Sequence, residues 1–180
     1  MPEVDLERWN LSLHEIAHLV VAESEGVHVQ GACLLRDGGG ACWHNECSGF
    51  SAALVASAGL AADKLSPDIP MPESAPPPSP APLATAVDVV GTSGTSEKPA
   101  WMSETQAPTP SDAGAVALWC VGGCLLEPER WPERHAWLMS LAERILSDRR
   151  ARWIRLAARL NRDGFLLPAD ARIVRDEHGI

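Results

Sequence analysis

A proline-rich stretch at residues 66–110 is the feature that most restricts how this chain can fold. It holds 11 of the 15 prolines in the 180-residue sequence, together with much Ser, Thr and Ala. Proline donates no backbone hydrogen bond, and a segment of this composition buries too little apolar surface to fold alone. The length suits one domain. We therefore expect a single domain over residues 1–180, with residues 66–110 as an insertion or mobile loop.

The segment before this stretch predicts a helix, a hairpin and a second helix. Residues 3–25 place apolar side chains at helical spacing, and Gly26 is a suitable stop. Residues 27–35 and 41–44 read as short strands on either side of a glycine-rich turn. Residues 50–65 are rich in Ala and Leu and contain no proline, which favours a helix.

The segment after it predicts helices only. Residues 112–121 return to a helical pattern, and Pro132 with Glu133 suits the first turn of another helix. A break near Ser147 separates two further apolar stripes, and Gly164 ends the last one. The predicted fold class is therefore α+β and predominantly α-helical, with a small β-hairpin and a C-terminal helical bundle.

Charge and hydropathy exclude several classes of partner. The net charge of -9 argues against nucleic acid, and no apolar run is long enough to cross a bilayer. Without a charged-then-apolar leader, a cytoplasmic location is the expectation, in which the five cysteines stay reduced. The C-terminal arginines interleave with apolar stripes, which indicates a solvated helix face paired with nearby acids. They are Arg144, Arg149, Arg150, Arg152, Arg155, Arg159 and Arg162.

The chemistry of the chain is concentrated in His14-Glu15-Ile16-Ala17-His18. On a helix, positions i and i+4 differ by only ~40° of rotation, so His14 and His18 project side by side. Two imidazoles at this spacing can hold one zinc ion at ~2.0–2.1 Å. Glu15 lies ~100° round the helix and can reach a metal-activated water without being a ligand. This is the HExxH arrangement of metallopeptidases.

Two other interpretations of this motif remain open. Ser12 and Glu15 have the spacing of a capping box, which would place the start of the helix there. The two histidines could also be ordinary polar residues on a helix surface. In that case the chain would be a purely structural helical protein.

Residues 13–22 (LHEIAHLVVA) resemble the active-site helix of the FtsH-like peptidases, the family of the ATP-dependent membrane zinc proteases. The family continues with a hairpin, matched by residues 27–44, and with a helix to which residues 58–65 (AGLAADKL) are similar. Residues 145–160 resemble its closing helices. The resemblance covers nearly the whole chain except residues 66–110. In this chain Ile16-Ala17 replaces Ala-Gly, Leu60 replaces Arg, and Asp63-Lys64 replaces two Glu.

The resemblance implies a zincin-like zinc peptidase. His14, His18 and Asp112 would be the metal ligands and Glu15 the catalytic base, with Asp88 as the rival third ligand. The structural alternative for Asp112 is that it caps the helix beginning there. No phosphate-binding loop of an ATPase is present in the sequence. The expected substrates are therefore short or unfolded polypeptides, and the alternative function is a catalytically silent peptide-binding module.

The hairpin carries the remaining predicted functions. The edge strand would bind substrate as an added strand through Ala41, Cys42, Trp43 and His44. Cys33, Cys42, His44 and Cys47 could form a second zinc site, although buried or free thiols are the simpler interpretation. Cys120 and Cys124 are interpreted as core residues.

Overall fold

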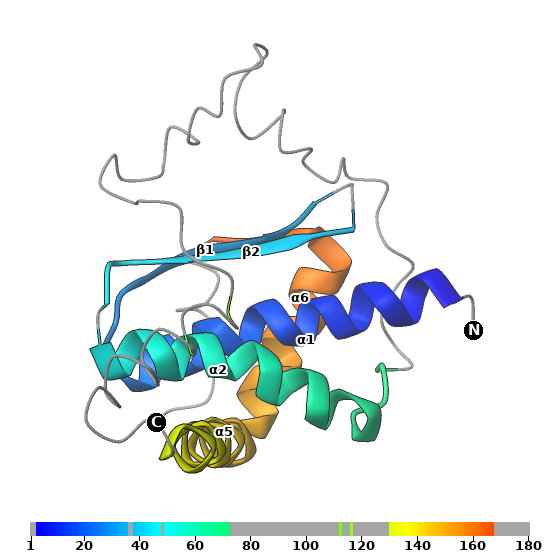
Figure 1. The fold of residues 1–180 in the computed structure, drawn as a ribbon. Helices are drawn as coiled ribbons and strands as arrows, with labels where there is room; N and C mark the ends of the chain where they lie inside the picture. Colours follow the sequence, from blue (N-terminus) through cyan, green and yellow to red (C-terminus); the bar gives the residue numbers. More distant parts are fainter. Residues whose placement is uncertain are drawn as a thin grey trace.

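The computed structural model of the chain describes residues 3–35, 38–47, 49–72, 112, 116 and 130–167. Helix α1 (Glu3–Ser24) is the central element, with a small sheet on one side and helices α2 and α5 on the opposite side, while α6 runs alongside α1 from the end of α5 to the sheet (Figure 1). The sheet consists of β1 (Val29–Leu34), β2 (Gly40–His44) and β3 (Phe165–Leu166). The other helices are α2 (Gly49–Leu65), the short η1 (Ser66–Asp68), α5 (Trp131–Asp148) and α6 (Arg150–Asp163).

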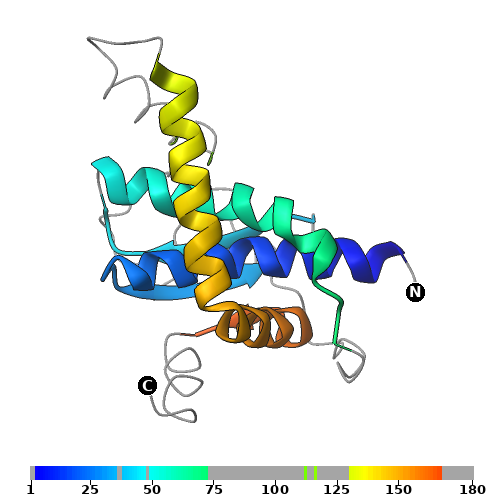
Figure 2. The same cartoon turned by 90° about the horizontal axis from the view of Figure 1, so that it is seen from below.

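Seen from below, α5 crosses α2 and α1, and α6 turns sharply away from the end of α5 (Figure 2). Residue Arg149 links the two helices. The predicted break near Ser147 is therefore confirmed. Gly164 ends α6 in a left-handed conformation with φ of 79°, and its amide donates to the carbonyl of Leu160.

From Ser12 to Ala22, helix α1 is buried on almost every side because it lies between the sheet and the other helices. Apolar side chains at the predicted helical spacing are buried, and the side chains of Leu19 and Ala22 are buried as well; the first group is Leu13, Ile16, Ala17, Val20 and Val21. Burial on this many faces places the second half of the helix in the core of the molecule rather than on its surface. The helix runs without interruption past Ser12, whose hydroxyl donates to the Arg8 carbonyl, so the capping-box interpretation is wrong.

Two tryptophans fix the core around α1. Trp9 and Trp153 are fully buried. Their indole N–H groups donate to the carbonyls of Ile69 and Leu13, at 3.2 and 2.8 Å. A buried indole needs such a partner, so each bond stabilises one packing arrangement. The second bond joins α6 to α1 one residue before the first histidine of the motif.

The sheet has the order β2-β1-β3 and is antiparallel throughout. The predicted hairpin is present, with Leu34 opposite Gly40 and Ala32 opposite Cys42. The third strand was not predicted. It is only two residues long, too short to show an alternating pattern, and it forms because the turn at Gly164 directs the chain back along β1.

The fold class is therefore α+β, mostly helical, with a small three-stranded antiparallel sheet. No helix in the described part of the chain is long and apolar enough to cross a membrane. Several of the arginines pair with acids as expected: Arg152 binds Glu23, and Arg159 and Arg162 bind Asp163. Residues 73–110 of the predicted proline-rich insertion lie outside the described residues. Cys120 and Cys124 also lie outside them. Of the predicted helix at 112–121, the described positions 112 and 116 are helical.

Candidate metal centre

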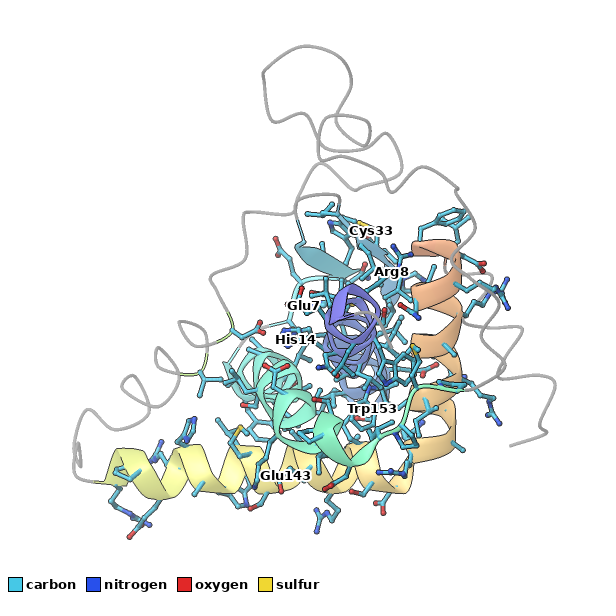
Figure 3. The ribbon with its side chains drawn as sticks, turned by 90° about the vertical axis from the view of Figure 1, so that its right-hand side faces the viewer. Glu7, Arg8, His14, Cys33, Glu143 and Trp153 are labelled. Carbon is cyan, nitrogen blue, oxygen red and sulfur yellow. The ribbon has the colours of Figure 1, made fainter. Side chains whose placement is uncertain are left out.

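Helix α1 presents its two motif histidines side by side, on the flank that faces α2. Figure 3 shows His14 on this flank. The ring centroids of His14 and His18 are 5.0 Å apart, with an angle of 72° between the ring planes. His18 is only 8% exposed. The pair therefore lies at the seam between the two helices and not on an open helix surface.

Asp112 meets both histidines at this seam. Its Oδ2 atom lies 3.1 Å from Nε2 of His14 and 3.1 Å from Nε2 of His18. One ligand atom from each of the three residues lies within 4.8 Å of the other two. The structure thus brings together the three side chains named from the sequence. Asp88 lies outside the described residues.

The second nitrogen of each ring is already engaged. Nδ1 of His18 donates to the Val55 carbonyl at 2.7 Å, and Nδ1 of His14 donates to Asp63 Oδ1 at 2.9 Å. Because both partners are acceptors, both protons reside on Nδ1 in the neutral rings. Both Nε2 lone pairs are then free for a cation. Metal-binding histidines show this arrangement, in which an acceptor behind the ring fixes its tautomer and orientation.

Charge within the cluster also favours a cation. Burial alone would lower the pKa of His14, but hydrogen bonds to Asp112 and Asp63 raise this pKa to about 9. Burial alone would raise the pKa of Asp112, but its bonds to the two histidines hold that pKa well below the usual range. A protonated imidazole thus balances the carboxylate in the metal-free chain. A divalent cation would replace that proton.

Glu15 occupies the adjacent face of α1 and is 7% exposed. Burial raises the pKa of its carboxyl group, while the charges of His18 and His14 act in the opposite direction. Its side chain packs against the backbone of β2, because a Cβ atom built on Gly40 would lie only 2.6 Å from Glu15 Cγ. A buried carboxylate beside a cation site is suited to accept and return a proton.

The α2 backbone forms the other wall of the centre. A Cβ atom at Gly59 would lie 2.5 Å from His14 Nε2 and 2.6 Å from His18 Nε2. Only glycine leaves room for the pair in these positions. The arrangement fits a small cation, since two imidazoles and a carboxylate converge where the helix backbone supplies space.

Sequence reasoning missed the roles of Gly40, Gly59, Asp63 and Val55 here. The sequence does carry one signal for Gly59. A glycine inside a helix lowers the stability of that helix by roughly 0.5–1 kcal/mol relative to alanine, so its presence among Ala and Leu residues indicates a close contact. Gly59 was noted only as part of the family resemblance. The carbonyl of Val55 could not have been found from residue type.

The predicted substrate residues Ala41, Cys42, Trp43 and His44 form β2, at the edge of the sheet in the described part of the chain. The strand packs on α1, next to Glu15.

The alternative second zinc site is not formed. The register sets Cys33 opposite Ala41 and Cys42 opposite Ala32, so the two thiols point to opposite faces of the sheet. Cys47 Sγ lies 4.0 Å from His44 Nδ1. Within the described residues, one group of three His, Cys, Asp or Glu side chains is close enough to share a metal ion, and it consists of His14, His18 and Asp112.

Comparisons with protein-family models, with curated proteins and with solved structures found no match. The function proposed below therefore depends on the geometry of the centre itself.

Proposed function

We propose that the chain is a zinc-dependent peptidase with a zincin-like, FtsH-like peptidase fold. One observation carries this proposal: His14, His18 and Asp112 each bring one ligand atom within 4.8 Å of the other two, and Glu15 adjoins the two histidines on α1. Two histidines and one carboxylate are a typical ligand set of catalytic zinc, which keeps a further coordination position for water.

His14, His18 and Asp112 would hold the ion, supported from behind by Asp63 and the Val55 carbonyl. Zinc at this position would supply Lewis acidity, which lowers the pKa of a coordinated water and polarises a peptide carbonyl. Glu15 would accept the proton of the attacking water and deliver it to the leaving amine. Its burial suits this exchange, because the raised pKa brings the carboxyl group closer to neutral pH.

The proposed substrates are short or unfolded polypeptides. An extended peptide lying along β2 would pair through its main chain, with Ala41, Cys42, Trp43 and His44 as the strand residues. Main-chain pairing tolerates many sequences but requires an extended, unfolded segment. The short distance between β2 and Glu15 supports this placement, since a peptide on the strand would pass beside the proposed base.

The test compares the wild type with Glu15→Gln in zinc content and in hydrolysis of an unfolded protein such as casein. We expect both proteins to bind one zinc ion per chain, and we expect the variant to hydrolyse ~10²–10⁴-fold more slowly. Equal rates would show that Glu15 is not the base. Zinc binding without hydrolysis by the wild type would identify the alternative, a catalytically silent peptide-binding module.

A further inference from the structure

The first residue of β2 meets the proposed base directly. A Cβ atom built on Gly40 would lie 2.6 Å from Glu15 Cγ, 2.6 Å from Oε1 and 2.8 Å from Cδ. These three are the heavy atoms nearest to that position, and all belong to one side chain. Real Cβ atoms do not approach heavy atoms so closely, so any larger residue at position 40 must displace the glutamate.

The need for glycine here is one of space and not of backbone conformation. Gly40 lies in regular strand pairing opposite Leu34, and its φ is not in the left-handed range. Any residue could therefore adopt its backbone angles. Gly38, in the turn just before, is the opposite case: its φ is +87°, and a Cβ atom there would have nothing within 4 Å.

The Glu15 side chain, once displaced by a residue at position 40, would have little space into which to move. Glu15 is 7% exposed and lies between α1 and β2, and its neighbours on the helix, Ile16 and Ala17, are fully buried. The helix is therefore held in place, and an overlap at Cγ is relieved most directly by turning the flexible carboxylate away. His14 and His18 contact α2 at Gly59, on a different element from this strand, so they should remain in position.

We propose that Gly40 is a positioning residue, whose missing side chain fixes the Glu15 carboxylate relative to His14, His18 and Asp112. The inference rests on the proposed peptidase function for its catalytic meaning, but the packing that it describes can be measured without any activity. It also links the two sides of the site, because the strand proposed to bind the peptide is the one that holds the base.

The first experiment is a double-mutant cycle on the thermal stability of the metal-free protein. Gly40→Ala should lower Tm by about 2–10 °C, because overpacking is costly in a filled core. In a Glu15→Ala background the overlapping atoms are gone, so the same substitution should cost less than half as much. Gly38→Ala is the control: its penalty comes from backbone strain and should be equal in both backgrounds.

The second experiment measures zinc content and kinetics. Gly40→Ala should keep one zinc ion per chain and an unchanged KM, while kcat falls about 10²-fold. In contrast, Gly59→Ala should lose the zinc itself. If Gly40→Ala does not fold alone but does fold together with Glu15→Ala, the inference is supported.

Equal Gly40→Ala penalties in both backgrounds would overturn the inference, and so would a wild-type kcat in that variant. A wild type that cleaves no peptide would refute the peptidase proposal instead. In that case the stability cycle alone decides whether Gly40 positions Glu15.

Discussion

Gly59→Ala is the substitution that should damage the metal centre most selectively. The new methyl carbon would lie 2.5 Å from His14 Nε2 and 2.6 Å from His18 Nε2, whereas ordinary contacts begin at 3.4 Å. The imidazoles would have to retreat by roughly 1 Å. Zinc sites accept deviations of only about 0.2 Å in ligand distance, so at least one ligand should be lost.

The expected magnitude follows from mass action. Disturbing even an indirect partner of a metal ligand costs about 10–100-fold in affinity, so displacing the ligands should cost at least about 100-fold. Zinc at 100 times its Kd stabilises the wild type by about 2.7 kcal/mol, or about 5–10 °C in Tm. At the same zinc concentration, a 100-fold weaker variant keeps only about 0.4 kcal/mol, or about 1–2 °C.

The assay is thermal unfolding with zinc and with chelator. In chelator, the two proteins should differ by only a few degrees, because the gain in helix propensity of about 0.5–1 kcal/mol partly offsets an overlap cost of about 1–3 kcal/mol. Ser57→Ala is a matched control on α2: its hydroxyl donates to the Ala53 carbonyl within that helix, so the zinc response should persist. A full zinc response in Gly59→Ala would show that Gly59 does not set the positions of His14 and His18.

Three further outcomes are expected. Asp63→Asn removes the charge behind one histidine ligand and should weaken zinc binding about 10-fold in a chelator competition; unchanged affinity would contradict that supporting role. Proline at Cys42 or Trp43 should weaken peptide binding, measured by fluorescence anisotropy, while zinc content stays intact; unchanged peptide binding would exclude pairing along β2. Trp153→Phe loses the bond to the Leu13 carbonyl and should lower the free energy of unfolding by about 1–2 kcal/mol, and no loss would show that this bond contributes little.

The local part of the site could be predicted from the sequence. The side-by-side placement of His14 and His18 depends only on the geometry of one helix, and the helix was evident from its apolar spacing. The stop of α6 at Gly164 and the break near Ser147 were equally local. Each depends on the conformational preference of a few consecutive residues.

The tertiary part could not be predicted in that way. Asp112 reaches the histidines across 98 positions of sequence, and only the family resemblance suggested it. The contacts of Gly40 and Gly59 arise because β2 and α2 approach α1 closely, which no periodic pattern encodes. Strand β3 forms through pairing with β1, and two residues carry too little pattern to reveal it.

The most direct test of the account is metal analysis of the purified protein beside His18→Ala. We expect about one zinc ion per chain in the wild type, loss of this zinc and of all hydrolysis in chelator, and no zinc in the variant. A wild type that is free of metal yet fully active in chelator would contradict this expectation, and so would a His18→Ala protein that retains its zinc.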